Sequence, residues 1–470
     1  MGKTGKQQKK LKLMNQTAQQ AVEEGEDEAG ESWQVAGVAL TPHDLQTAWK
    51  VLSALGKSPE SLKEPQYKSL RTALHAIKLS KAPSGVSLSG QISDALTDEC
   101  FDEALLLLGE MRSKAAFPKL GALQRWVRTC DAASADGTRN ARVMKVLDAI
   151  LRTADPGLVG ALASSSVAQS NPQATVVGGV RLLGSWDPLP HRVQHGGFEQ
   201  LGRVVCPTPE DLAKFQPHMS VIYSEQGADR RPPNQYPMTI YTNSLTMLDY
   251  SHEVPTTRVS VSDIPNAFLL QDLFSLEECR QLLLGCESAG FTPDLPLSAD
   301  AGNSILAHNV FWLSDPSLTS KMESRALKLM PPTMVDDDGV HGVLDGINPR
   351  WRVYRYVPGA VYRPHIDGAW PKSSYDLDTK EYVYDASEGT SWSKLTMVIY
   401  LNEGFGGGET TFFVPSKSEG VMDAVAVVPR AGCALLFPHG TVKGNLLHEG
   451  SAVTEGAKYI VRTDVLYKRE

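Results

Sequence analysis

The sequence has few cysteines, and none are arranged in pairs. The six cysteines among 470 residues lie far apart, and no two stand in a Cys-x-x-Cys arrangement. We therefore expect neither a disulfide framework nor a zinc site built from cysteines. This scarcity favours a reducing compartment, which predicts a cytoplasmic or nuclear protein.

The sequence also lacks a long apolar run and an excess of positive charge. No stretch reaches the roughly 18 apolar residues of a membrane span, and the basic N-terminus lacks the apolar core of a signal peptide, so no membrane partner is expected. Lys and Arg number 46 against 54 Asp and Glu, a net charge of −8. Tight binding of bulk nucleic acid is disfavoured, because that affinity comes from cations on phosphates. A local basic patch would still permit a nucleic-acid partner.

The length of the chain predicts more than one domain. Residues 1–35 are rich in Lys, Gln, Glu and Gly and predict a disordered tail with basic and acidic stretches. Residues 36–155 predict a helical domain: Thr41-Pro42 begins one helix, 98–133 predict a helical hairpin, and 141–151 predict a further helix. Residues 156–257 hold Pro, Gly and short β-type runs, and predict a linker or irregular region with some strands.

The pattern changes near residue 258. A strand is followed by Ser275, a capping residue, and by an amphipathic helix over 276–289. Short strands separated by Gly, Pro and Asp come next, which is typical of a β-sandwich or barrel. They are expected at 351–357, 395–401, 409–414, 424–428, 433–437 and 459–467.

A His-x-Asp pair lies between the first two of these β-type runs. His365 and Asp367 are two residues apart, so in a strand both side chains point to the same face. An imidazole nitrogen and a carboxylate oxygen can then bind one metal ion. A second histidine from a distant strand would complete the two-histidine, one-carboxylate triad of non-haem Fe(II) oxygenases, which leaves positions open for a cosubstrate and O₂.

Three blocks around this pair resemble a known family. They are RVYRYVPGAVYRPHIDG, LTMVIYLNEGFGGGETTFF and GCALLFPHGTVKGNLLHEGSAVTEGAKYIVRTDVLY. In this order they resemble the prolyl 4-hydroxylase-like branch of the Fe(II)- and 2-oxoglutarate-dependent dioxygenases. The resemblance implies an α+β chain. Its C-terminal domain, 258–470, would be a double-stranded β-helix (jelly roll) with flanking helices and a metal-site core at about 348–470, preceded by a mostly helical N-terminal region.

The resemblance also implies the remaining metal ligand and an anchor for 2-oxoglutarate. His448, which opens HEG, is the expected distal ligand, and His439 is the alternative. His448 is preferred because Lys458 follows it by ten residues, the family's spacing for the cation that pairs with the far carboxylate of 2-oxoglutarate. A dianionic ligand needs such a positive group. Arg462, on the same face of a regular strand, is the alternative to Lys458.

Two tyrosines before the first ligand are further candidates. By family resemblance, Tyr356 and Tyr362 bind the cosubstrate or line its pocket; core tyrosines are the alternative interpretation. Tyr400 and Thr410 are weaker candidates on neighbouring strands. The polar stretch 372–393 predicts either a lid beside the site or a surface insertion.

The resemblance implies a dioxygenase that uses Fe(II), 2-oxoglutarate and O₂, with L-ascorbate to keep the iron reduced. It would hydroxylate a prolyl or other side chain of a protein or peptide and release succinate and CO₂. No catalytic residue beyond the metal centre is expected. Alternatives are an oxygenase or demethylase of nucleic acids or small molecules, and a non-catalytic binding module. The complete triad with Lys458 speaks against the module, because a decayed site would be expected to have lost one of the four.

Overall fold

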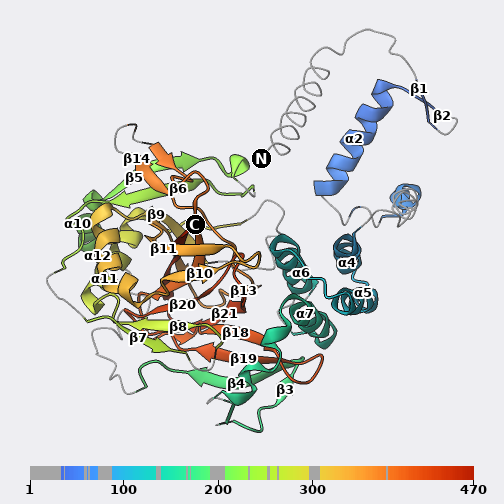
Figure 1. The fold of residues 1–470 in the computed structure, drawn as a ribbon. Coiled ribbons are helices and arrows are strands. Elements are labelled where there is room, and N and C mark those ends of the chain that lie inside the picture. Colours follow the sequence, from blue (N-terminus) through green and yellow to red (C-terminus); the bar gives the residue numbers. More distant parts are fainter. Residues whose placement is uncertain are drawn as a thin grey trace. The chain divides into compact units, whose positions relative to one another are not determined.

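The computed structural model divides the chain into two compact units, residues 1–86 and 87–470 (Figure 1). It describes residues 33–35, 38–57, 61, 64–71, 87–133, 139–165, 168–169, 171–190, 207–230, 233–250, 255–261, 264–295, 307–376, 379 and 381–470. Most of the predicted N-terminal tail lies outside these residues. Of the helices described, none combines the length and the apolar character that crossing a membrane requires.

In the first unit, the described residues form a short hairpin, one long helix and a 3₁₀ turn. Strands β1 (Trp33–Val35) and β2 (Val38–Leu40) pair antiparallel, and α2 (Pro42–Lys57) and the 3₁₀ turn η2 (Pro65–Tyr67) follow. Helix α2 begins at the predicted position. Thr41 Oγ1 accepts from the Asp44 N–H, and Asp44 accepts from the Thr41 N–H, so two otherwise unpaired donors of the first turn are satisfied.

A large mixed sheet forms the centre of the second unit. Among the described residues it has eleven strands, in the order β5-β6-β9-β12-β23-β16-β20-β8-β7, with β11 pairing β23 and β10 pairing β11. The bounds are β5 Met219–Glu225, β6 Met238–Asn243, β7 Thr257–Ser260, β8 Phe268–Gln271, β9 His308–Leu313, β10 Thr333–Val335, β11 His341–Ile347, β12 Arg350–Tyr356, β16 Ser391–Tyr400, β20 Ala434–Pro438 and β23 Lys458–Arg469.

A second sheet of six described strands has the order β13-β21-β18-β19-β4-β3. Its strands are β3 Val176–Val177, β4 Val180–Trp186, β13 Tyr362–His365, β18 Thr410–Pro415, β19 Met422–Val427 and β21 Leu447–Gly450. Two small pairs complete the strands: β14 (Ser374–Asp376) with β15 (Glu381–Val383), and β17 (Gly406–Gly407) with β22 (Val453–Glu455).

Most buried apolar side chains described in the second unit belong to three large clusters, and a fourth, small one contains Ile240, Phe311 and Leu313. Residues of both sheets form one buried cluster between them, for example Tyr356 and Tyr400 with Phe412 and Val425. A second cluster joins the outer face of the large sheet to helices α10 (Pro209–Phe215), α11 (Leu276–Ala289) and α12 (Pro316–Ala326). The third joins the second sheet to α4 (Leu88–Thr97), α5 (Phe101–Ser113), α6 (Leu120–Ala133) and α7 (Ala141–Ala154).

The structure places the boundary between units at residue 86, whereas the sequence suggested one near 155. Helices α4 to α7 belong to the same unit as the sheets because α7 buries every residue from Val143 to Thr153 except Lys145. A helix that is buried on nearly all sides needs neighbours on nearly all sides. The other helices cover part of α7, and β18 covers another part. The predicted hairpin at 98–133 and helix at 141–151 are confirmed as elements.

The region 156–257, expected to be a linker with some strands, contributes strands to both sheets. Strand β4 pairs parallel with β19, and β6 pairs parallel with β9. Both strands pair with strands that are distant in the sequence, so their place in the sheets could not be predicted from the local sequence. In the C-terminal part, the six short strands predicted from the sequence are confirmed, with bounds shifted by one to four residues.

A buried ion pair links α12 to α11, and we expect its loss to lower the free energy of unfolding by several kcal/mol, roughly 3–5. Helix α11 begins after Ser275, as predicted, and Glu278 completes the capping box. Arg325 binds Glu278 through two hydrogen bonds of 2.9 and 2.8 Å, and both side chains are buried. The Arg325→Met change is expected to destabilise the protein by about 3–5 kcal/mol, because it leaves a buried carboxylate unpaired.

Urea denaturation measures this loss, and the matched control is Arg280→Met in α11. Arg280 also forms a two-hydrogen-bond pair with a glutamate, Glu277, but both side chains are about 40% exposed. This variant is expected to lose about 1 kcal/mol or less. Equal losses in the two variants would contradict the assignment.

Candidate metal centre

The structure brings His365, Asp367 and His448 together at one end of the second sheet. His365 ends β13 and lies directly opposite His448 of β21, and the two ring centroids are 4.3 Å apart. The Nε2 atoms lie 3.6 Å (His365) and 3.7 Å (His448) from the Asp367 carboxylate. One ligand atom from each residue lies within 4.8 Å of the others, so the three can bind one metal ion.

Hydrogen bonds to the backbone fix the tautomer of both histidines. His365 Nδ1 lies 2.8 Å from the carbonyl oxygen of Arg363, and His448 Nδ1 lies 3.0 Å from that of Leu446. Because a carbonyl oxygen only accepts, each Nδ1 carries a proton and donates. Nε2 is therefore the nitrogen of each ring that remains for a metal ion, the arrangement usual for metal-binding histidines. Burial, and then the neighbouring His365, lowers the pKa of His448 to about 3, so this ring stays neutral.

Asp367 is ionised and paired with a buried arginine. Burial alone would raise the pKa of this carboxyl, but the Arg462 guanidinium holds it well below its usual range. Arg462 Nη2 lies 3.2 Å from Asp367 and 3.4 Å from Asp464. The sequence named Arg462 as an alternative anchor for 2-oxoglutarate; the structure places it beside the carboxylate of the metal cluster.

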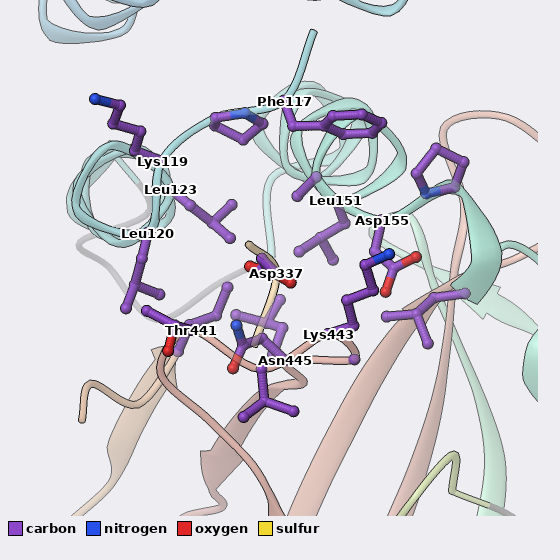
Figure 2. Close-up of a pocket in the computed structure, with 18 of the residues that line it drawn as sticks. Phe117, Lys119, Leu120, Leu123, Leu151, Asp155, Asp337, Thr441, Lys443 and Asn445 are labelled. Atoms are coloured by element: carbon purple, nitrogen blue, oxygen red, sulfur yellow. The ribbon is translucent and has the colours of Figure 1, made fainter. Parts of the chain in front are cut away.

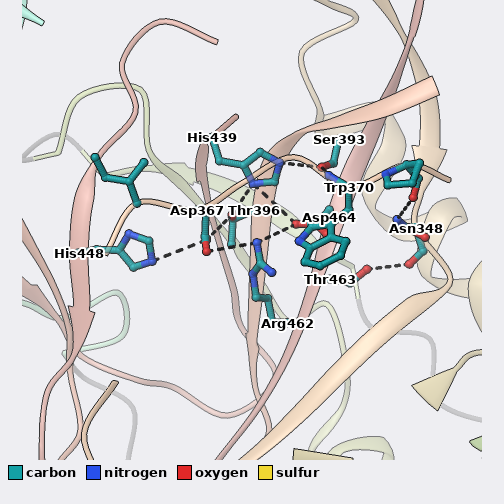
Figure 3. Close-up of polar contacts among 12 residues, drawn as sticks. Asn348, Asp367, Trp370, Ser393, Thr396, His439, His448, Arg462, Thr463 and Asp464 are labelled. Atoms are coloured by element: carbon teal, nitrogen blue, oxygen red, sulfur yellow. Dashed lines mark hydrogen bonds and ion pairs between the residues drawn. The ribbon is translucent and has the colours of Figure 1, made fainter. Parts of the chain in front are cut away.

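His439 lies outside the cluster, at the end of a chain of hydrogen bonds that leads to it (Figure 3). Thr396 Oγ1 donates to Asp367 Oδ2 at 2.7 Å, so it accepts from His439 Nδ1, 2.6 Å away. His439 Nε2 then accepts from Ser393 Oγ at 2.7 Å, and Ser393 accepts from the Trp370 N–H at 2.8 Å. Burial lowers the pKa of His439 and keeps it neutral. Both of its nitrogens are used, so His439 has no lone pair for a metal.

Lys458 is a buried lysine that lines the same cavity as the three residues of the cluster. Its Nζ donates to the carbonyl oxygen of Gly408 at 2.6 Å and lies 5.5 and 5.7 Å from the ring centroids of Tyr356 and Tyr400. Burial lowers its pKa to about 7. Among the described residues Lys458 forms no ion pair with a carboxylate. The Glu409 carboxylate raises this pKa, but by less than burial lowers it, so the ammonium remains costly to bury and the position favours an anionic ligand.

The predicted tyrosines line the same cavity, and their phenols are protonated. Burial raises the pKa of Tyr356 well above its usual value, and the charge of Tyr354, and then burial, raise that of Tyr362. The Tyr362 ring packs on His365, with centroids 4.2 Å apart. Tyr400 binds Thr410 at 2.9 Å. The lining residues are Tyr354, Tyr356, Tyr362, His365, Asp367, Val398, Thr410, His448, Gly450, Lys458, Ile460 and Arg462.

Sequence reasoning missed several residues that shape the site. Thr396 donates directly to Asp367, Ser393 bonds His439 behind Thr396, and no motif marks either residue. Gly408 could have been identified from the sequence, because it is the last glycine of GFGGGE, a run typical of a turn. Its φ is +73°, and a Cβ there would lie 3.2 Å from Lys458 Cδ and 2.9 Å from Phe405. Glycine is therefore required where the backbone approaches Lys458.

The residues present suit a ferrous ion and 2-oxoglutarate. Two neutral imidazoles and one carboxylate are the donor set of non-haem Fe(II) sites. Lys458 and the protonated tyrosines offer one cation and hydrogen-bond donors for a carboxylate, in a cavity that they share with the metal cluster.

The 372–393 stretch, expected to be a lid or a surface insertion, contains the β14–β15 hairpin. This hairpin packs on β5 through Tyr382 and Tyr223, with ring centroids 5.5 Å apart.

Part of the chain is similar to a known family of enzymes. Residues 351–463 match the model of the 2OG-Fe(II) oxygenase superfamily. No curated protein matched the chain. Among solved structures, a viral collagen prolyl hydroxylase from Paramecium Bursaria Chlorella virus-1 in complex with 2OG is 16% identical, covers 45% of this chain and 100% of its own, and has a TM-score of 0.28.

Two further solved structures are similar at the same level. A Pseudomonas putida prolyl-4-hydroxylase is 18% identical, covers 44% of this chain and 85% of its own, and has a TM-score of 0.24. A Trichoplax adhaerens prolyl hydroxylase, in complex with a hypoxia inducible factor peptide, is 16% identical, covers 43% and 83%, and has a TM-score of 0.29. The resemblance predicted from the sequence is confirmed: the segment that contains His365, Asp367, His448 and Lys458 is similar to the 2OG-Fe(II) oxygenase superfamily.

Proposed function

We propose that the second unit is an Fe(II)- and 2-oxoglutarate-dependent dioxygenase. His365, Asp367 and His448 would hold the iron, and Lys458 would pair with the far carboxylate of 2-oxoglutarate. The observation that carries the proposal is the placement of two imidazoles and an ionised carboxylate in one cavity with a buried lysine that forms no ion pair with a described carboxylate. With iron and 2-oxoglutarate bound, the centre supplies the oxidising power to hydroxylate a C–H bond, consuming O₂ and releasing succinate and CO₂.

The protein's own residues position these groups. The backbone bonds at the Nδ1 atoms aim both histidine lone pairs, and Thr396 holds one oxygen of Asp367. The aromatic rings of Phe412 and Phe437 lie 5.7 and 4.6 Å from the His448 ring and restrict its rotation. Such fixed ligands lower the reorganisation that binding requires.

We propose a prolyl or other side chain of a protein as the oxidised group. The sequence blocks resemble the prolyl 4-hydroxylase-like branch.

An anaerobic titration tests the proposal. Fe(II) followed by 2-oxoglutarate is expected to give the visible charge-transfer band of the chelate. Zn(II) in place of Fe(II) is the control, because its filled d shell occupies the same ligands without such a band. With air, the iron-loaded protein is expected to convert 2-oxoglutarate to succinate, and proline-containing peptides are then screened for a gain of one oxygen by mass spectrometry. A folded protein that binds no iron would contradict the proposal and favour a non-catalytic module.

A further inference from the structure

Helix α6 reaches the backbone between two of the proposed iron ligands. Gln124 Nε2 donates to the carbonyl oxygen of Ile366 at 3.1 Å, although the two residues are 242 positions apart in the sequence. Ile366 stands between His365 and Asp367, and β13 ends at His365. The Ile366 carbonyl therefore lies beyond the paired part of the strand, where Gln124 is its partner.

The absence of a side chain at Gly368 leaves space for the side-chain amide of Gln124. Gly368 follows Asp367, and a Cβ at this position would lie 3.2 Å from Gln124 Nε2, closer than ordinary van der Waals contact. Any other residue at 368 would push against the glutamine. The position of the Gln124 amide is thus set by its hydrogen bond to the Ile366 carbonyl and depends on a glycine at residue 368.

Apolar packing alone does not set the position of α6 here. Leu123 of α6 and Ile366 belong to one buried apolar cluster, but a cavity of about 730 Å³ interrupts the packing of α6 and α7 on the outer face of the strands that carry the ligands (Figure 2). Leu120 and Leu123 of α6 line it on one side, and Ile366 and Leu447 line it on the other. Across such a gap dispersion contacts are lost, so a polar tie counts for more.

A second tie reaches the neighbour of the other histidine. Arg139, just before α7, binds Glu449 at 2.8 Å and lies 4.8 Å from the Phe413 ring centroid. Glu449 follows His448 in β21. The helical layer therefore holds both ligand-bearing strands from behind.

We propose that Gln124 is a positioning residue of the metal centre, and that α6 holds the peptide unit between His365 and Asp367 in the orientation that binds metal. This inference rests on the proposed function for the identity of the metal. Without the hydrogen bond the Ile366–Asp367 peptide can rotate, and metal binding must then order it. Loss of a group that orients metal ligands typically weakens metal binding by about 10- to 100-fold. Because Gln124 acts through the backbone, we expect about tenfold.

The test measures anaerobic Fe(II) affinity by competition with a chromogenic chelator. Gln124→Met keeps the length of the side chain but removes the donor, and Gln124→Glu keeps the shape but offers only acceptors. Both are expected to raise the Kd for Fe(II) about tenfold. Gln124→Lys restores a donor and is expected to recover most of the affinity. The energy of the band formed with 2-oxoglutarate should shift in the first two variants and return in the third.

Two controls remove contacts of the same helical layer that lie away from the ligands. Arg112→Met breaks the 3.3 Å pair with Glu419, and Ser93→Ala removes the acceptor of the Trp126 indole N–H, 2.8 Å away. Both are expected to keep the wild-type Kd even where they lower the melting temperature. If Gln124 had only a structural role, its variants would likewise have a lower melting temperature but an unchanged Kd for Fe(II).

The outcomes separate the two proposals. A wild-type Kd in Gln124→Met overturns the positioning role, and the proposed function stands if the wild type forms the chelate band. Wild-type protein that binds Fe(II) but forms no band with 2-oxoglutarate overturns the proposed function, and the Kd values alone then decide the role of Gln124. Wild-type protein that binds no Fe(II) overturns both.

Discussion

The His448→Ala variant is expected to lose Fe(II) binding and the chelate band with 2-oxoglutarate. His448 supplies one of only three protein donors in the cluster, and its Nε2 faces Asp367 at 3.7 Å. Removing a ligand should cost more than the roughly 10- to 100-fold that loss of an outer partner costs, so we expect the affinity to fall by more than about 100-fold. Anaerobic titration with Fe(II) and then 2-oxoglutarate measures both losses.

His439→Ala is the matched control, because it removes the same side chain nine positions earlier from an equally buried place. His439 orients Asp367 only through Thr396. This variant is expected to keep the band but to need about tenfold more Fe(II) to reach it. Circular dichroism checks that both variants are folded. If His439→Ala lost the band and His448→Ala kept it, the choice of distal ligand would be reversed.

The His365–Asp367 pair could be predicted from the sequence because its signal is local, although β13 ends at His365 and Asp367 lies just beyond the strand. The helix after Ser275 likewise follows from its cap and its apolar spacing. The distal histidine is different: no local rule separates His448 from His439. Family spacing to Lys458 favoured His448, and the structure supplies the physical reason, since both nitrogens of His439 already hold hydrogen bonds.

The parts that the sequence did not predict are contacts between distant segments. Gln124 meets Ile366 across 242 residues, and β4 joins β19 in parallel over a similar separation. Side chains such as Thr396 or Gln124 are ordinary in their own segments and acquire a role only when folding places a partner beside them. The unit boundary at residue 86 was missed for a related reason: the nearly complete burial of α7 depends on strands more than 250 residues later.

The affinity for 2-oxoglutarate is expected to fall steeply above neutral pH. In the ligand-free protein, burial lowers the pKa of Lys458 to about 7. The far carboxylate of 2-oxoglutarate needs the ammonium form, so binding above pH 7 must first take up a proton. The Kd should be nearly constant below pH 7 and rise towards tenfold per pH unit above it, about 50-fold between pH 7 and pH 9. The chelate band, titrated with 2-oxoglutarate at each pH, measures this.

Two variants isolate the lysine from other pH effects. Lys458→Arg keeps a cation that stays protonated throughout this range, so its affinity profile is expected to be flat. Lys458→Met removes the cation and leaves the far carboxylate without a partner, at a cost of about 2–5 kcal/mol, or roughly 30-fold or more in Kd. Pyruvate is the matched ligand, because it has the 2-oxo acid group and no far carboxylate. Its Kd should differ little between wild type and Lys458→Met.

The same experiment decides between Lys458 and Arg462. A guanidinium is charged at every pH used, and Arg462 is already paired with Asp367 and Asp464. If Arg462 were the anchor, the wild-type profile would be flat, Lys458→Met would bind 2-oxoglutarate like wild type, and Arg462→Met would lose discrimination between 2-oxoglutarate and pyruvate. If Lys458 is the anchor, that discrimination disappears in Lys458→Met. In that case Arg462→Met acts through Asp367 and weakens Fe(II) binding together with both ligands.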